Sequence, residues 1–361
     1  MTAARPLRVG IAGANARRAW ARDAHLPAIR ALPGIEIAAV SARTQDLAEA
    51  AAAAFGAPAA YGDTLAMVRD PAIDIVAVTV KVPEHRAIVL AALAAGKHLY
   101  CEWPLGRDRA EAEEMAAAAK AAGTHVAIGL QGENSIAIRH AADLVRGGAI
   151  GRVLSMRIVS PTAGWGAEAP PFYAYLQDKR NGATLSTIAG GHTLAAIEAI
   201  IGPYRDVSAV NSIRIDRMRI SGTDETVART SPDHVAVIGR HDGGVVSTLE
   251  VLGGVPDPAF LFEVRGEAGT LRIDGHFGGG YQASSLSVSA TVPIPPAPEP
   301  PVPALAGPPQ NVSQLYARLA ADIRAGTRTV PDFDRAVRLT RLLDAIDTAS
   351  DEGRRVAPES L

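Results

Sequence analysis

A glycine turn near the N-terminus carries the residues best suited to bind an anion. The apolar segment Val9–Ala12 predicts a short buried strand, Gly13 ends it, and a helix is predicted over Ala16–Arg30. Backbone N–H groups and the dipole at a helix N-terminus favour a negatively charged ligand, and a dinucleotide pyrophosphate takes this position in a doubly wound sheet. The turn therefore predicts a phosphate-binding loop with Gly13, Asn15 and Ala16 as its candidate residues.

The turn departs from the pattern G-x-G-x-x-G at two positions. Counting from Gly13, the second glycine is replaced by Asn15 and the third by Arg18. Asparagine tolerates positive φ better than other non-glycine residues, so Asn15 can still form a tight turn. Arg18 cannot allow the close helix–strand packing that glycine permits, and we expect a looser contact there. An ordinary strand–turn–helix that binds no ligand is the alternative.

The end of the second predicted strand bears on the choice between NADP and NAD. An acidic residue there would bind the ribose 2′-hydroxyl of NAD, whereas arginine suits a 2′-phosphate. The strand Ile35–Val40 is followed by Ser41, Arg43 and Thr44, with no acidic residue at the turn. A guanidinium and two hydroxyls can together hold a phosphate, which favours NADP. A solvated arginine beside an NAD site is the alternative.

Composition excludes several classes of protein. The 361 residues carry a net charge of −2, so a nucleic-acid partner is not expected. Cys101 is the single cysteine, and the histidines lack a ligand spacing, so we predict no disulfides and no metal site. No apolar run is long enough to span a membrane, and residues 1–7 contain no apolar segment typical of a signal peptide. We expect a cytoplasmic protein.

Hydrophobic periodicity predicts strands that alternate with helices in the first 130 residues. The predicted strands are 9–12, 35–40, 74–80, 98–101 and 126–130, and the predicted helices include 45–55 and 110–122. This alternation is typical of an α/β domain with a doubly wound parallel sheet, here over residues 1–130. Ligands bind at the carboxyl ends of such strands, where Val80, Lys81 and His85 are candidate cofactor-binding residues.

The pattern changes after Gln131. Segments 152–160, 207–215, 234–240, 245–251, 260–266 and 269–274 are strand candidates, and several alternate apolar with polar residues. They predict an α+β domain over residues 131–310 with a large open, mainly antiparallel sheet. Residues 291–309 are rich in proline and predict a surface connector. Residues 311–361 predict helices that pack back on the body.

Several motifs then occur in an order that resembles one family. They are Val9-Gly10-Ile11-Ala12-Gly13, Ala94-Ala95-Gly96-Lys97-His98 with Glu102-x-Pro104, and Asn181-Gly182 ahead of Gly191-His192. In this order they resemble the glucose–fructose oxidoreductase / inositol dehydrogenase (Gfo/Idh/MocA) family over nearly the whole chain. The resemblance implies a Rossmann domain, a second α/β domain whose open sheet forms a homodimer or homotetramer, and hydride transfer between NAD(P) and a sugar-like small molecule.

One branch of that family, which includes the fungal galactose-regulon repressor, is more similar still. The shared residues are Asn15, Trp20, Glu102-Trp103, Leu130-Gln131-Gly132, Asn181-Gly182, Gly191-His192-Thr193 and Ser231-Pro232-Asp233-His234. That repressor binds a dinucleotide but is known as a regulator and not as an enzyme. The resemblance therefore supports two hypotheses, an enzyme and a regulator. By analogy with the family, Glu102 is expected to hydrogen-bond a nicotinamide-ribose hydroxyl or local backbone, and Gln131 to lie in the substrate pocket.

Two of the three catalytic groups usual in the family are replaced in this sequence. Trp103 stands where the family has a lysine, and Ile188 stands where it has an aspartate four residues before a histidine. Indole has no proton to exchange, so we expect Trp103 to contact the cofactor or substrate by stacking. His192 remains as a candidate acid or base, the alternative being a histidine held by hydrogen bonds at a domain interface.

Tyrosines and lysines supply the other candidate groups. Tyr173 or Tyr175 can donate a proton to a carbonyl oxygen or imine nitrogen, unless both are packing aromatics. Lys81 and Lys179 are the lysines considered as replacements for the missing one. The sequence thus predicts an NADP(H)-dependent oxidoreductase for a sugar-like or other small carbonyl, alcohol or imine substrate. A catalytically silent dinucleotide-binding regulator and a protein that binds no dinucleotide are the alternatives.

Overall fold

The chain forms two compact units in a computed structural model that describes residues 5–17 and 19–360. Unit 1 holds the chain up to Gln131 together with Pro300–Val337, and unit 2 holds Gly132–Glu299 together with the chain from Arg338. The division after Gln131 lies one residue from the predicted boundary. The predicted third segment, residues 311–361, is not a unit of its own, because its two halves belong to different units.

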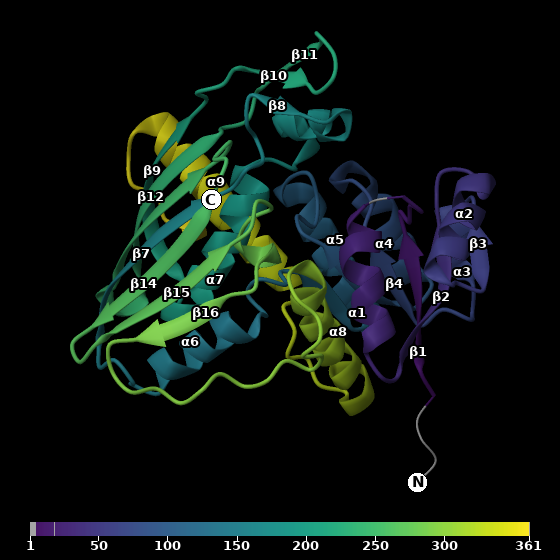
Figure 1. Ribbon diagram of the computed structural model, residues 1–361, viewed down its shortest axis with the longest axis horizontal. Coiled ribbons are helices and arrows are strands. Elements are labelled where there is room, and N and C mark those ends of the chain that lie inside the picture. The colour runs from purple at the N-terminus through teal and green to yellow at the C-terminus, as the bar shows by residue number, and fades with distance from the viewer. Residues whose placement is uncertain (1–4, 18, 361) are drawn as a thin grey trace. The chain divides into compact units, whose positions relative to one another are not determined.

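Unit 1 is built on a parallel sheet with the strand order β3-β2-β1-β4-β5-β6 (Figure 1). Its strands are β1 (Leu7–Ala12), β2 (Ile35–Ser41), β3 (Ala59–Tyr61), β4 (Ile75–Val78), β5 (His98–Glu102) and β6 (Val126–Gly129). The strand order changes direction between β1 and β4, which is the switch point where ligands bind in open α/β sheets. The short strand β3 is absent from the sequence prediction.

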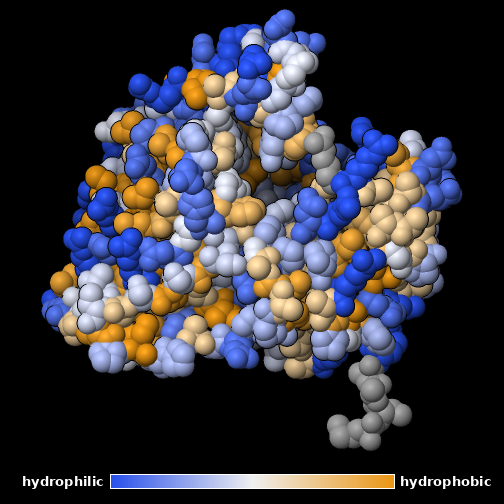
Figure 2. All heavy atoms as spheres, viewed as in Figure 1, coloured by the Kyte–Doolittle hydropathy of each residue, from blue (hydrophilic) through white to orange (hydrophobic). Residues whose placement is uncertain are grey.

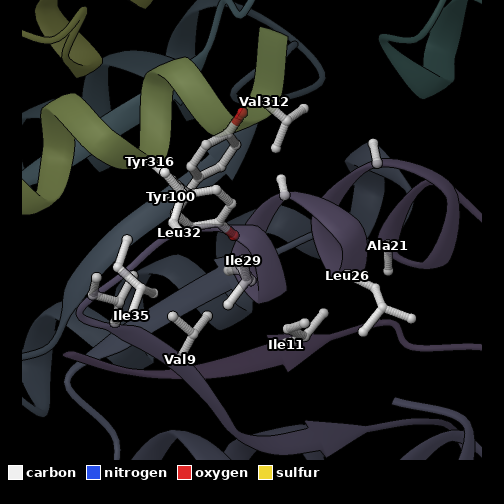
Figure 3. Packing of buried hydrophobic residues seen from close by; sticks show 14 of the residues in the cluster. Val9, Ile11, Ala21, Leu26, Ile29, Leu32, Ile35, Tyr100, Val312 and Tyr316 are labelled. Carbon is white, nitrogen blue, oxygen red and sulfur yellow. The ribbon is translucent and has the colours of Figure 1, made fainter. Parts of the chain in front are cut away.

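Helices cover both faces of this sheet. They are α1 (Leu26–Ala31), α2 (Gln45–Phe55), α3 (Thr64–Arg69), α4 (His85–Ala94), α5 (Arg109–Ala122) and α8 (Pro308–Ala325). Helices α1, α2 and α8 share one buried core with β1 and β2, and Val9 of β1, Ile29 of α1 and Val312 and Tyr316 of α8 all belong to it (Figure 3). The C-terminal part of the chain thus returns to the core of the first domain.

Local sequence explains where several helices begin and end. The Asp108 side chain accepts a hydrogen bond from the Glu111 N–H at 2.9 Å and caps the start of α5. Gly123 ends that helix in the left-handed conformation, with φ 68°. The Thr44 side chain caps α2 in the same way as Asp108 caps α5, with Leu47 N–H as the donor.

The helix predicted over Ala16–Arg30 is shorter than expected. It begins with a π-helical turn, Ala21–His25, which leads into α1, and the described residues before Ala21 form a loop. Asn15 explains the delay, because its Oδ1 accepts the Arg17 N–H at 2.9 Å and so competes with helix formation. Arg18, expected to loosen a helix–strand contact, lies outside the described residues.

Unit 2 contains a larger mixed sheet with the order β16-β15-β14-β7-β13-β12-β9 (Figure 1). Its strands are β7 (Val153–Pro161), β9 (Tyr204–Ser212), β12 (His234–His241), β13 (Val246–Leu252), β14 (Ala259–Gly266), β15 (Thr270–His276) and β16 (Ser287–Ala290). Only the β7–β13 pair is parallel among these described strands. A parallel sheet followed by a mainly antiparallel one confirms the predicted fold class.

The remaining elements of unit 2 are helices and a small three-stranded sheet. The helices are α6 (Ile136–Arg146), α7 (Gly191–Ile201) and α9 (Phe333–Glu352), of which α9 belongs to unit 2 from Arg338 onward. A π-helical turn, Ser186–Gly190, leads into α7. The small sheet has the order β11 (Thr226–Ala228), β10 (Arg217–Ile220), β8 (Glu168–Ala169). Residues 291–307, all described, contain no helix or strand, as expected of the proline-rich connector.

One face of the seven-stranded sheet presents apolar side chains to solvent. Val210 of β9, Ile238 of β12 and Val246 of β13 are 66%, 54% and 40% exposed. Charged residues lie between them, including Arg240, which pairs with Asp206. Figure 2 shows hydrophobic and hydrophilic residues interspersed over these strands. We call Val210, Ile238 and Val246 the apolar sheet face.

Candidate functional site

The candidate cofactor site lies at the carboxyl edge of the sheet in unit 1. Register places Ala12, Val78, Cys101 and Ile128 side by side on β1, β4, β5 and β6. The residues that follow them therefore line one edge, and these are Gly13, Thr79, Glu102 and Gly129. The edge contains both sides of the switch point between β1 and β4.

Gly13 is required at this edge by its backbone and by its surroundings. It adopts φ +91°, and a Cβ there would lie 2.8 Å from Val80 Cγ1 and 3.1 Å from the Val80 nitrogen. The amides of Gly13 and Ala14 both donate to the Ser41 carbonyl oxygen, at 3.1 and 3.0 Å. These two N–H groups hold β1 against β2. An anion at this edge must therefore bind N–H groups further along the loop.

Asn15 contributes through its side chain and not through a left-handed backbone. Asn15 does not have a positive φ. The expectation that it makes the tight turn through a left-handed backbone is therefore wrong. Its Oδ1 instead caps the Arg17 amide. Ala16 lies between them in the loop, so the predicted phosphate-binding residues occupy a loop stabilised by an asparagine cap.

The three residues predicted to hold a 2′-phosphate have different surroundings. Ser41 is fully buried, and its hydroxyl pairs with the Thr64 hydroxyl at 2.9 Å, so it supports the strand end and does not face a ligand. The Thr44 hydroxyl accepts the Leu47 N–H as a helix cap. Arg43 is exposed, and it is the charged residue of the three.

His85 ties two loops of the edge together from the interior. Its Nε2 lies 3.1 Å from the Val80 carbonyl oxygen, and its Nδ1 lies 3.2 Å from the Leu105 carbonyl oxygen and 3.6 Å from Cys101 Sγ. Burial lowers the pKa of His85 and raises that of Cys101, so both groups are neutral. A neutral imidazole carries one N–H, so His85 donates to one of these two carbonyl oxygens, that of Val80 or that of Leu105. The expectation that His85 packs behind the cofactor loop fits this arrangement, whereas direct cofactor contact does not.

The next strand end carries Glu102, Trp103 and Pro104. The Glu102 Oε1 lies 2.8 Å from His25 Nε2, a pairing that sequence reasoning missed. Trp103 is only 5% exposed, and its bond to Pro104 is cis. Lys81, in the loop after β4, is exposed. The site therefore holds one fixed carboxylate and an indole where the family resemblance led us to look for a lysine.

His192 is a buried, neutral imidazole in unit 2. It is the second residue of α7, directly after the π-helical turn that contains Ile188, and it is 3% exposed. Burial lowers the pKa of His192 from 6.5 to about 3. No group among the described residues hydrogen-bonds its buried Nδ1, while its backbone carbonyl accepts from the Tyr281 hydroxyl. An unsatisfied buried ring nitrogen with a π-turn beside it is typical of a functional position.

The predicted tyrosines lie on the short 3₁₀ helix Pro171–Gln177. Tyr173 is exposed and its ring packs on that of Phe172, with centroids 4.5 Å apart. Burial raises the pKa of Tyr175 to about 12, so its hydroxyl keeps its proton at neutral pH. Asn181 donates from Nδ2 to the Tyr175 carbonyl oxygen at 2.8 Å and fixes this segment. Tyr175 is half-buried, whereas Tyr173 is exposed, so Tyr175 is the tyrosine of the two that can present its hydroxyl from inside the protein.

Two other predicted residues have no catalytic geometry of their own. Lys179 is exposed, and its backbone amide donates to the Thr230 hydroxyl at 3.0 Å. Gln131 is buried at the end of unit 1, and its Oε1 has no hydrogen-bond partner among the described residues. An unsatisfied amide oxygen can accept a ligand hydroxyl, so Gln131 stays a candidate for the substrate pocket.

The motif Ser231-Pro232-Asp233-His234 has a structural role in unit 2. Asp233 and Arg229 form a buried ion pair at 2.7 Å, and Arg229 also donates to Gln177 Oε1 at 2.8 Å. Asp233 accepts the amides of Arg214 and Ile215 at 2.8 Å each. The Asp233 carboxylate is fully engaged in these contacts, so it anchors the loops beside the small sheet.

Two further searches of the described residues bear on function. They contain no group of three or more His, Cys, Asp or Glu side chains arranged to hold a metal ion. In the same part of the chain, every helix is too short or too polar to cross a membrane.

A parallel sheet with its glycine turn at the switch point is the architecture of a dinucleotide-binding Rossmann domain, here followed by an open mixed sheet. Residues 7–130 match the family described as the oxidoreductase family with an NAD-binding Rossmann fold, GFO_IDH_MocA, and residues 137–275 match the C-terminal domain of Gal80p. The chain belongs to the Gfo/Idh/MocA family, with a Gal80p-like second domain. The predicted resemblance is confirmed.

Relatives of this chain include both a dehydrogenase and a regulator. The dehydrogenase aclE of Aspergillus oryzae is 30% identical over 249 residues, which cover 66% of this chain and 68% of that protein. The galactose/lactose metabolism regulatory protein GAL80 of Saccharomyces cerevisiae is 28% identical over 308 residues, which cover 76% of this chain and 68% of that protein. A levoglucosan dehydrogenase solved with NADH and levoglucosan has the same fold, with a TM-score of 0.82, 22% identity and coverage of 98% and 99%.

Proposed function

We propose that the chain is an NADP(H)-dependent oxidoreductase that transfers hydride to or from a sugar-like or other small carbonyl, alcohol or imine substrate. The observation that carries the proposal is the carboxyl edge of unit 1, where Gly13 keeps the end of β1 free of side chain and Glu102 presents a fixed carboxylate. Membership of an oxidoreductase family with an NAD-binding fold supports it, as do relatives named dehydrogenases. We keep the sequence-based expectation of a cytoplasmic protein.

The residues at this edge fit a bound dinucleotide. The bare Cα of Gly13 permits close approach of a pyrophosphate to the loop that Asn15 caps, and Arg43 is placed for the adenosine half. Glu102 accepts hydrogen bonds on the other side of the switch point. The dinucleotide supplies the hydride that the substrate gains or returns.

Unit 2 supplies the groups proposed to handle the proton. Tyr175 keeps its proton and can donate it to a carbonyl oxygen or imine nitrogen. His192 is neutral, so in this proposal its unsatisfied Nδ1 accepts a hydrogen bond from the substrate and does not act as an imidazolium acid. Trp103 shapes the pocket without exchanging a proton.

The choice of NADP rests on Arg43 and is tested by titration. We expect NADPH to quench or enhance protein fluorescence at lower concentration than NADH. Arg43→Glu should weaken NADPH binding at least about tenfold and leave NADH binding unchanged or stronger, because the guanidinium binds the 2′-phosphate. Arg205→Glu, an equally exposed arginine of unit 2, is the control. Equal binding of both dinucleotides would refute the NADP preference, and binding of neither would refute the enzyme.

A catalytically silent regulator is the second candidate. Trp103 and Ile188 replace the lysine and aspartate expected from the family resemblance, and the GAL80 relatives are named as regulatory proteins. The two candidates differ in turnover. An oxidoreductase consumes many equivalents of NADPH with at least one member of a panel of sugars, carbonyls and imines, whereas a regulator binds the dinucleotide and consumes none.

We further propose that two copies of the chain associate through the apolar sheet face. Val210, Ile238 and Val246 expose apolar side chains on three neighbouring strands of the sheet, with polar residues between them. A second copy presents the same strands, and intervening residues of both charges favour self-pairing. The homodimer, or a tetramer built from it, is the assembly that the family resemblance implied.

A further inference from the structure

A buried row of hydrogen bonds in unit 1 joins three segments that are far apart in the chain. His25, at the end of the π-helical turn, places Nε2 2.8 Å from Glu102 Oε1 and Nδ1 2.8 Å from the Tyr316 hydroxyl. His25 and Tyr316 are fully buried, and the Glu102 side chain is 13% exposed. The imidazole thus connects the helix after the glycine loop, the end of β5, and α8.

The chemistry of the three groups fixes which atom donates each hydrogen bond. An ionised carboxylate only accepts, so the His25 proton lies on Nε2 and points at Glu102. Burial holds the pKa of Tyr316 well above its usual range, so the phenol keeps its proton and donates to Nδ1. The row therefore runs from phenol to imidazole to carboxylate in one direction, and it engages both ring nitrogens of His25 and one carboxylate oxygen of Glu102.

Aromatic packing locks the row in place. The rings of Tyr100 and Tyr316 stack with centroids 4.6 Å apart, as Figure 3 shows at the contact with α8. The His25 ring meets Tyr100 and Tyr316 edge-on, at 5.0 and 5.6 Å. A side chain packed on all sides in this way keeps a single rotamer. The hydrogen bond from this fixed imidazole in turn fixes the orientation of the Glu102 carboxylate.

A glycine leaves room beside the other carboxylate oxygen of Glu102. A Cβ on Gly129, the neighbour of Glu102 on β6, would lie 3.0 Å from Glu102 Oε2. Glu102 also lies two strands from Gly13, on the side of the switch point opposite β2. Two strand spacings amount to about 10 Å, the reach from a pyrophosphate at Gly13 to the second ribose of a dinucleotide.

We propose that His25 and Tyr316 are positioning residues that orient Glu102 to accept hydrogen bonds from the second ribose of the bound dinucleotide. This inference rests on the proposed function and deepens it. It assigns to α8, more than 200 residues after β5, a part in cofactor binding, because Tyr316 orients the imidazole that orients the carboxylate. His25 and Tyr316 act through Glu102 and do not touch the ligand.

Comparison of ADP with ADP-ribose isolates this contact, because only ADP-ribose carries the second ribose. We expect calorimetric titration of the full chain to show ADP-ribose binding at least about tenfold tighter than ADP, since hydrogen bonds to a charged acceptor have that effect. His25→Leu and Glu102→Gln should each reduce this advantage to about threefold or less and leave ADP affinity unchanged. His25→Gln, which retains a donor for Glu102, should keep most of it, and Tyr316→Phe should have an intermediate effect.

His98→Gln is the matched control, because His98 lies at the opposite end of β5. It should leave the ADP-ribose advantage intact. If His25→Leu unfolds the chain, Tyr316→Phe and Glu102→Gln decide the question. A lower melting temperature with an unchanged ADP-ribose advantage would show a merely structural role and overturn the inference, as would equal binding of both ligands by the wild type. Binding of neither ligand by the wild type would instead overturn the proposed function.

Discussion

Acid should destabilise this protein through His192 in particular. Burial lowers the pKa of its imidazole from 6.5 to about 3, so between these values the unfolded chain binds a proton that the folded chain does not. The free energy of unfolding therefore falls as pH falls, with the full contribution present above 6.5 and lost progressively toward 3. By linkage, the loss attributable to His192 between about pH 8 and about pH 5 is about 2 kcal/mol.

Urea unfolding of matched variants at the two pH values measures this loss. His192→Gln removes the titrating group at similar volume, so between about pH 8 and about pH 5 it should lose about 2 kcal/mol less than the wild type. His276→Gln, at a side chain that is 57% exposed and pairs with Asp257, is the control for removal of an imidazole from the surface, and it should keep more of the acid-induced loss than His192→Gln. Any effect of either substitution that does not depend on pH cancels in the comparison.

Two outcomes would refute the reasoning. If His192→Gln loses as much stability on acidification as the wild type, the imidazole is not desolvated in the folded chain, and its unsatisfied Nδ1 would have to be hydrated. If His276→Gln behaves like His192→Gln, the effect comes from overall charge and not from burial.

The remaining predictions concern the glycine turn and the apolar sheet face. Gly13→Ala forces a Cβ to within 2.8 Å of Val80 and an alanine into φ +91°, so NADPH affinity measured by fluorescence should fall at least about tenfold. The far-ultraviolet circular dichroism spectrum should stay the same, and unaltered affinity would show that the turn does not approach the ligand. Ile238→Asp should convert a dimer into a monomer by light scattering, with a dissociation constant raised at least about tenfold. Leu47→Asp, at a similarly exposed leucine of α2, should leave the assembly unchanged, and a persistent Ile238→Asp dimer would exclude this interface.

The elements with strong local signals could be predicted from the sequence. Helix α2 has the predicted bounds Gln45–Phe55, and α5 ends at the predicted Gly123, because periodicity and capping residues are local properties. The short strand β3, Ala59–Tyr61, was missed because three small or aromatic residues give no pattern. The π-helical turns were missed because nothing in their residue types differs from a regular helix.

The candidate site was predicted less completely than the fold. Gly13 and Glu102 follow directly from strand ends, which is why motif position located them. The partners of Glu102 could not be found in this way, because His25 lies 77 residues from Glu102 and 291 residues from Tyr316. Ser41 was assigned to phosphate because sequence shows a hydroxyl but not that Thr64 already pairs with it.

The position of each site histidine depends on the number of residues in the π-helical turn before or around it. These turns are Ala21–His25 and Ser186–Gly190. A π-turn contains one residue more than the α-helical turn that would replace it. Removing one residue from either segment would leave a continuous helix but rotate one side of it by about 100° relative to the other. His25 would then leave Glu102, and His192 would leave its buried position, although neither histidine had been substituted. Variants of this chain that conserve every named side chain can therefore lose the site through a single-residue deletion. A one-residue gap in either π-helical turn of a related sequence thus indicates a difference in function.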